Sequence, residues 1–119
     1  MKGDIRVIKN PISLSELSEI ADERYGDLVK AVVDVEQEIM AVGGEFHADE
    51  EVILMEQDGS SREHTWGINI WPAKQGTDEF VQFDSMINLK PSFGNRTRGV
   101  DSEEIKKTIQ DIVFRLIIS

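Results

Sequence analysis

Polar and apolar residues alternate over much of the stretch from Leu28 to Pro91, a pattern that indicates strands with one buried face. In residues 30–36 every odd position is apolar, whereas the even positions are mostly charged. A second apolar run at residues 39–42 predicts the other half of a hairpin, with its turn near Gln37. The charged side chains on the even face of the first strand are Lys30, Asp34 and Glu36.

Three later segments also have strand-like patterns. Glu51–Glu56 is apolar on both faces and ends at a strong turn signal, so it predicts a central strand that is covered on both sides. Thr65–Trp71 and Phe80–Lys90 alternate again. Short links between the segments favour an antiparallel meander, because parallel neighbours need a crossover of about a dozen residues.

The flanking segments predict one strand and two amphipathic helices. Ile5–Lys9 alternates apolar and basic residues, which suits a short edge strand. The first helix is expected from about Leu14 to Tyr25, with Ser13 as its N-cap. The second is expected to start after Asp101 as its N-cap and to continue almost to the end of the chain.

These elements predict an α+β fold in a single domain over residues 1–119. Its sheet is expected to be a mostly antiparallel β-meander of about five or six strands. The two amphipathic helices are expected to cover one face of that sheet, which leaves the other face polar.

The composition excludes several kinds of chemistry. The chain has no cysteine, so it has no disulfide framework, thiolate zinc site or cysteine nucleophile. Its formal net charge is −10, which makes nucleic acid an unlikely partner because such binding depends on Lys and Arg. No apolar run approaches the ~20 residues that span a bilayer, and the first residues lack a secretory pattern. We therefore expect a cytoplasmic protein with no membrane partner.

Several strings in the chain resemble a family of small prokaryotic proteins that is known only as a domain of unknown function. The similarity is carried by Val29–Glu36, His47–Glu51, Trp66–Pro72 and Asp84–Pro91, followed by residues 94–96. The resemblance implies a soluble prokaryotic protein. It supplies no activity, cofactor or catalytic residue.

The polar residues of the predicted strands are candidates for a binding site, since antiparallel neighbours can place them on one sheet face. A Trp, two carboxamides and an Asp–Lys pair are typical of a pocket for a small polar ligand. One alternative is a solvated face with exposed ion pairs worth about 0–1 kcal/mol each. Another is a protein interface anchored by Trp71, Phe80 and Met86. The candidates are Lys30, Asp34, Glu36, Asn69, Trp71, Asp84, Asn88 and Lys90.

The segment from Lys90 to Arg98 is the only locally basic one, and it predicts a loop that could present amides and guanidinium groups to an anion. Asn95, Arg96 and Arg98 join the candidate residues on this basis. The alternative is that these cations pair with nearby carboxylates.

Two weaker candidates come from the string His47–Glu51. An imidazole beside carboxylates is a possible metal or acid–base group, so His47 and Asp49 are weak candidates for metal ligands. The alternative is a solvated turn with an exposed histidine. No cofactor is identified by any motif.

Three functional hypotheses follow. The first is a ligand-binding or protein-interaction module that uses the polar sheet face and the loop at residues 90–98. The second is a small hydrolase or transferase with Asp84, Glu36 or His47 as acid–base groups, with or without a divalent metal. The third is a homodimer formed through apolar residues of the same face.

Overall fold

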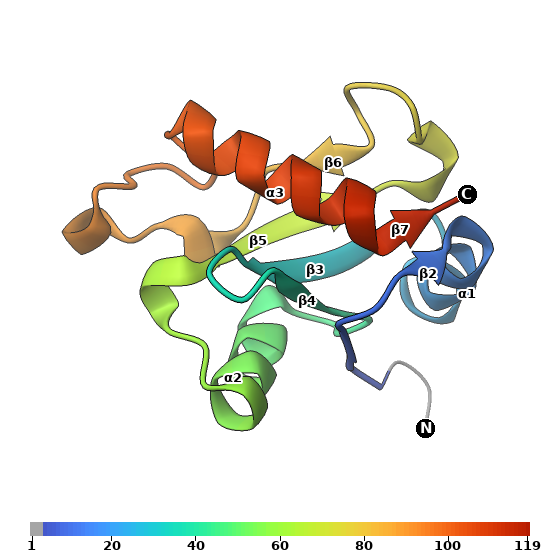
Figure 1. Cartoon of the computed structure of the whole chain (residues 1–119), viewed down its shortest axis with the longest axis horizontal. Helices are drawn as coiled ribbons and strands as arrows, with labels where there is room; N and C mark the ends of the chain where they lie inside the picture. The colour runs from blue at the N-terminus through green and yellow to red at the C-terminus, as the bar shows by residue number, and fades with distance from the viewer. Residues whose placement is uncertain (1–3) are drawn as a thin grey trace.

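A five-stranded antiparallel sheet lies at the centre of the computed structural model, which describes residues 4–119 (Figure 1). The antiparallel sheet predicted from the alternation is confirmed, and so is the edge position of the first strand. The hairpin turn also lies where it was expected, with Glu38 at a positive φ of 59°. From one edge to the other, the strands are β1 (Arg6–Ile8), β4 (Ile39–Val42), β3 (Val29–Asp34), β5 (Thr65–Ile70) and β6 (Val81–Gln82).

Two helices pack on one face of the sheet and form the larger core. They are α1 (Leu14–Arg24) and α3 (Glu103–Leu116), and both were predicted. Their apolar stripes pack against Ala31 and Val33 of β3 and against the residues that pair with these two on β4 and β5. The hydrophobic effect of this burial accounts for the period-two pattern of the sequence.

A third helix, α2 (His47–Asp58), packs on the opposite face, so the strand predicted at Glu51–Glu56 is wrong (Figure 1). A run of four apolar residues is too short to distinguish a strand from a helix by its period. In the helix only Leu54 of that run is fully buried, whereas Val52 is 46% exposed. The helix ends at Gly59, whose φ of 67° is left-handed. The second face is therefore covered in part, not solvated throughout.

The long strand predicted at Phe80–Lys90 is also wrong, because β6 contains only Val81–Gln82. The chain then turns through two short 3-10 helices, Met86–Asn88 and Pro91–Phe93. Ser85 starts the first of them by accepting a hydrogen bond from the amide of Ile87 at 3.2 Å. This turn folds the segment back over the sheet beside α2.

The helix caps agree with the sequence in one case and differ in the other. The side chain of Ser13 accepts from the amide of Glu16, as expected of an N-cap. The N-cap of α3 is Ser102, and not Asp101, whose carboxylate instead accepts hydrogen bonds within the preceding loop. An unpredicted parallel pair, β2 (Ile12–Ser13) with β7 (Ile117–Ile118), joins the start of α1 to the end of α3.

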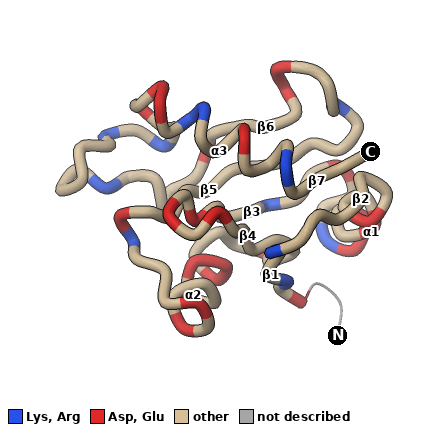
Figure 2. Tube along the Cα trace, viewed as in Figure 1, with Lys and Arg blue, Asp and Glu red and all other residues tan. Residues whose placement is uncertain are grey.

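The charges are unevenly distributed along the fold (Figure 2). Lys and Arg side chains lie on the segment between β6 and α3, whereas α2 carries Asp and Glu. Among residues 4–119, no helix is long and apolar enough to cross a membrane.

Candidate functional site

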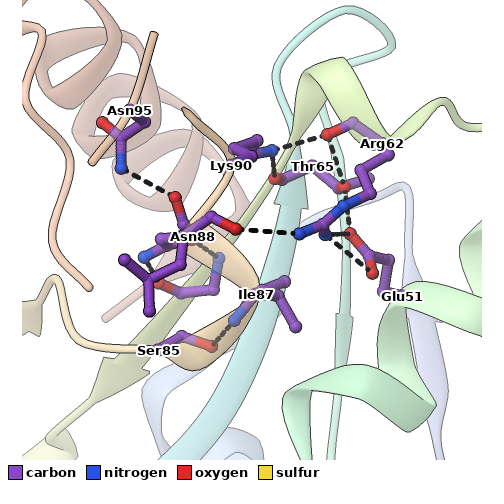
Figure 3. Close-up of polar contacts among 10 residues, drawn as sticks. Glu51, Arg62, Thr65, Ser85, Ile87, Asn88, Lys90 and Asn95 are labelled. Atoms are coloured by element: carbon purple, nitrogen blue, oxygen red, sulfur yellow. Dashed lines mark hydrogen bonds and ion pairs between the residues drawn. The ribbon is translucent and has the colours of Figure 1, made fainter. Parts of the chain in front are cut away.

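The side chain of Asn88 takes the place of a strand backbone at the edge of β5 (Figure 3). Its Oδ1 accepts from the Gly67 amide at 2.8 Å, and its Nδ2 donates to the Gly67 carbonyl at 3.0 Å. The same Nδ2 donates to the carbonyl of Arg98 at 2.9 Å. Asn88 is fully buried, so its hydrogen-bonding groups are already used by the protein.

Lys90 is also buried and fully engaged (Figure 3). Its Nζ donates to the carbonyls of Arg62 and Thr65 and lies 4.0 Å from the centre of the Trp66 ring, close enough for a cation–π contact. Burial, and to a smaller extent the nearby Arg62 guanidinium, lower the pKa of Lys90 to about 8. Because no part of this ammonium group faces a cleft, Lys90 holds the chain around β5 in place.

Asn95 stabilises the loop at residues 90–98 through hydrogen bonds of its buried side chain. Its Nδ2 donates to the carbonyls of Asn88, Thr97 and Gly99, and its Oδ1 accepts from the amide of Asp101. Asn95 is 4% exposed, and both ends of its carboxamide are engaged by the protein, so neither end is left for a ligand. In contrast, Arg96 is exposed on the outside of this loop.

Asp34 has a structural role at the far end of β3. It accepts hydrogen bonds from Ser60, Gln37 and the backbone amide of Glu36, and it is 1% exposed. Burial raises the pKa of Asp34, but these hydrogen bonds outweigh it and leave that pKa below its ordinary value. Glu36 is exposed beside this turn, at the opposite end of β3 from Lys30.

The remaining polar residues of the sheet face meet at a cleft of about 310 Å³. Lys30 of β3 lies directly opposite Asn69 of β5, so both side chains stand on the same face. The next pair on that face, Val32 and Gly67, is covered by α2 and by the segment that follows β6. The Lys30–Asn69 pair, which lies beyond the N-terminus of α2, therefore forms the floor of the cleft.

Hydrogen-bond chemistry determines the orientation of the Asn69 carboxamide. The indole N–H of Trp71 can only donate, so the Gln82 atom 3.1 Å from it is Oε1. The Asn69 atom that faces the same oxygen at 3.2 Å is then Nδ2. The other end of the carboxamide is Oδ1, which is buried and has no hydrogen-bond partner. A buried acceptor without a partner is costly, about 1–3 kcal/mol, and rare in folded proteins.

His47 is the first residue of α2, and it lines the cleft beside Lys30 and Asn69. The expected solvated turn with an exposed histidine is wrong, because His47 is 7% exposed. Its Nε2 is 2.8 Å from the carbonyl of Ile68 and must carry the proton, since a carbonyl only accepts. Burial lowers the pKa of His47, which favours the neutral ring. In that ring Nδ1 carries no proton and can accept a hydrogen bond.

An ion pair and two exposed apolar side chains complete the walls. Arg98 Nε donates to Asp84 Oδ1 at 2.8 Å, and both side chains are about half exposed. Phe46, the residue before α2, is 57% exposed, and Met86 is 62% exposed. All four residues line the cleft, which therefore combines a polar floor with apolar side chains at its margin.

Trp71 lines a different hollow, of about 380 Å³. Gln82 lies between Trp71 and Asn69 and is hydrogen-bonded to both. The other walls of this hollow include Lys74 and Glu79, which form an exposed ion pair. It contains no buried polar group that lacks a partner, so we regard it as a surface feature. Asp49 lines another hollow, near Gly44, and no group of three potential metal ligands occurs within residues 4–119.

The candidates from the sequence thus separate into two sets. Asp34, Asn88, Lys90 and Asn95 are buried in hydrogen bonds of the fold, whereas Lys30, Asn69, Asp84 and Arg98 line the cleft with His47. The remaining candidates belong to neither set and do not line this cleft; they are Glu36, Asp49, Trp71 and Arg96. The sequence patterns did not identify Phe46, which lines the cleft, or Gln82, which bridges Asn69 and Trp71. The position of Phe46 next to the polar string His47–Glu51 was the sequence signal that could have identified it.

The fold and the cleft define a small α+β protein with one sheet face only partly covered. The chain belongs to the family described as "Protein of unknown function (DUF5674)", whose model matches residues 6–116. The resemblance inferred from the sequence is therefore confirmed. Comparison with curated proteins and with solved structures gives no match.

Proposed function

We propose that this protein is a cytosolic binding module that holds a small polar ligand in the cleft above Lys30 and Asn69. One observation carries the proposal, namely that Asn69 lines the cleft and its buried Oδ1 has no hydrogen-bond partner. A ligand that donates a hydrogen bond to this oxygen would remove the cost of leaving it unpaired.

The surroundings of Asn69 support binding over a purely structural role. The hydrogen bond from Trp71 fixes the Gln82 oxygen, so Asn69 Oδ1 cannot exchange places with Nδ2 without losing the hydrogen bond between Asn69 and Gln82. The cleft volume of about 310 Å³ is at the small end of the range for ligand pockets. A preorganised acceptor in a small cleft favours a small ligand over a large surface partner.

The test is chemical-shift mapping of the ¹⁵N-labelled protein against a set of small amines, alcohols, amides and carboxylates. We expect at least one compound to shift the amides of residues 46–48, Asn69 and Met86 in a saturable way. Asn69→Leu should abolish that binding, whereas Lys107→Met, an exposed change on α3, should leave it intact. The proposal fails if every saturable shift maps away from the cleft.

A second candidate, general acid–base chemistry, is favoured by the neutral state of His47. A neutral imidazole with Nδ1 unprotonated can act as a base at neutral pH, and Asp84 lies in the same cleft. Assays with chromogenic esters and phosphate esters would show turnover that His47→Gln removes. Glu36, the other proposed acid–base group, lies away from this cleft and contributes to no such arrangement.

A further inference from the structure

We infer that the ligand of the cleft is a zwitterion of the α-amino acid type with an apolar side chain, an inference that rests on the binding function proposed above. Its carboxylate would lie at Lys30 and the first turn of α2. Its ammonium group would donate to Asn69 Oδ1. Its side chain would pack between Phe46 and Met86.

The cationic part of the cleft is the Lys30 ammonium group. In the part of the chain that the structure describes, Lys30 forms no ion pair, and its Nζ lies 5.6 Å from the centre of the Tyr25 ring. The other cation of the cleft, Arg98, is already paired with Asp84. Lys30 is therefore the group that remains for a ligand anion.

The start of α2 adds to the attraction for an anion. Its N-cap, Phe46, has no side-chain oxygen, so the first amides of the helix receive no side-chain cap. The positive end of the helix dipole thus faces the cleft. Of the two acids in this first turn, Asp49 lines another hollow, and burial raises the pKa of Glu50 well above its ordinary value. Neither carboxyl group therefore replaces a ligand anion in the cleft.

The unpaired acceptor of the cleft calls for a donor at a short distance from that anion. Asn69 Oδ1 lacks a donor, whereas the Asp84 carboxylate is already paired with Arg98. Because Lys30 and Asn69 are direct cross-strand partners, their Cβ atoms are separated by about 5 Å. A small ligand that reaches both side chains would therefore carry its anion and its donor close together in one molecule. The carboxylate and ammonium groups of an α-amino acid have this spacing.

The apolar margin accounts for the third part of the ligand. Phe46 and Met86 are among the most exposed large apolar side chains of residues 4–119, and both line this one cleft. Exposed apolar side chains beside a polar floor are typical of a ligand site. They would bury an aromatic or aliphatic side chain of the ligand, at about 25 cal/mol per Å² of apolar surface.

Isothermal titration with three probes of similar shape tests this inference. The probes are L-phenylalanine, 3-phenylpropionate, which lacks the amine, and 2-phenylethylamine, which lacks the carboxylate. We expect L-phenylalanine to bind at least tenfold more tightly than either of the others. Lys30→Met should remove its advantage over the amine, and Asn69→Leu should remove its advantage over the acid.

A matched pair of Phe variants tests the apolar contact. Phe46→Ser should weaken L-phenylalanine binding at least fivefold, whereas Phe114→Ser, at an exposed Phe of α3, should have no effect. Equal binding of either single-charge probe, mapped to the cleft by chemical shifts, would overturn the zwitterion and leave the binding function standing. Absence of binding by all three probes would also overturn it, and the broader compound set then decides the binding function separately.

Discussion

The two ends of the second sheet face carry the same kinds of residue but use them differently. At one end, Asn88 and Lys90 are buried and every polar group of theirs has a protein partner (Figure 3). At the other end, Asn69 has a buried oxygen without a partner, and Lys30 has no ion pair among the described residues. Residue type is therefore a poor guide to function on this face, and the satisfaction of hydrogen bonds is a better one.

The difference comes from what covers each end. The segment after β6 folds over Gly67 so closely that a Cβ there would lie 2.5 Å from Ser85 Cβ. Helix α2 covers the middle of the face and begins at His47, and the Lys30–Asn69 pair lies beyond it at the cleft. Covered polar groups must be paired within the protein, whereas groups at the cleft can await a ligand.

The largest effect is expected for Asn88→Ala. The substitution leaves the amide and carbonyl of Gly67 buried without partners and opens a cavity, so we expect a loss of about 4 kcal/mol in the free energy of unfolding. Urea denaturation measures it. Asn10→Ala, at an exposed position in the loop before β2, is the control and should change stability by less than about 0.5 kcal/mol. A loss of binding at unchanged stability would mean that Asn88 belongs with the cleft residues.

Gly67→Ala should destabilise the protein by about 3 kcal/mol, because the added methyl group overlaps Ser85 and approaches His47. Gly99→Ala is a matched control, since its Cβ meets nothing closer than 3.4 Å and should cost less than about 1 kcal/mol. A second change, Ser85→Gly, should recover part of the loss in Gly67→Ala. If it recovers nothing, the close approach of the two segments is not the cause.

A pH-dependent effect of intermediate size is expected for Lys90. Its folded pKa of about 8 is below the ordinary value of about 10.4, so the unfolded chain binds more protons between these values. The stability contributed by Lys90 should therefore rise with pH, by about 1–2 kcal/mol from pH 7 to pH 10. Thermal unfolding of the protein and of Lys90→Met, compared at each pH, isolates this term. A difference independent of pH would mean that the Lys90 ammonium group is solvated in the folded protein.

The smallest effect on stability is expected for Asn69→Leu. This change removes one hydrogen bond to Gln82 but also the buried oxygen without a partner, so the free energy of unfolding should change by less than about 1 kcal/mol. Asn95→Leu is the contrasting variant and should cost at least about 3 kcal/mol, because it breaks four hydrogen bonds. Similar losses in both variants would remove the distinction between the two regions.

The errors of the sequence-based prediction have local causes. The run Val52–Met55 has no visible period, so the sequence could not show that it is a helix with only Leu54 fully buried. The alternation of Phe80–Lys90 continues past β6, but Ser85 and Asn88 form a turn and a side-chain pairing that compete with a strand. Both errors led to a sheet face that was expected to be more open than it is.

The sequence patterns identified some residues of the cleft and missed others, because strand alternation does not show how distant segments pack on the sheet. Alternation placed Lys30 and Asn69 on one face correctly, because side chains two apart in a strand share a face. It could not show that Lys90 would be buried at that face or that His47, distant in the sequence, would join the cleft. Those positions depend on how α2 and the segment after β6 pack on the sheet.

The sequence by itself determined the α+β class, the antiparallel hairpin, the two outer helices and the N-cap at Ser13, because periodicity and capping are local properties. Only the tertiary structure decided which polar residues are buried and paired and which remain at a cleft. Burial depends on what packs against a side chain, and at Gly67 and Asn69 the covering residues come from segments far along the chain. That packing separates a structural asparagine, Asn88, from a candidate binding one, Asn69.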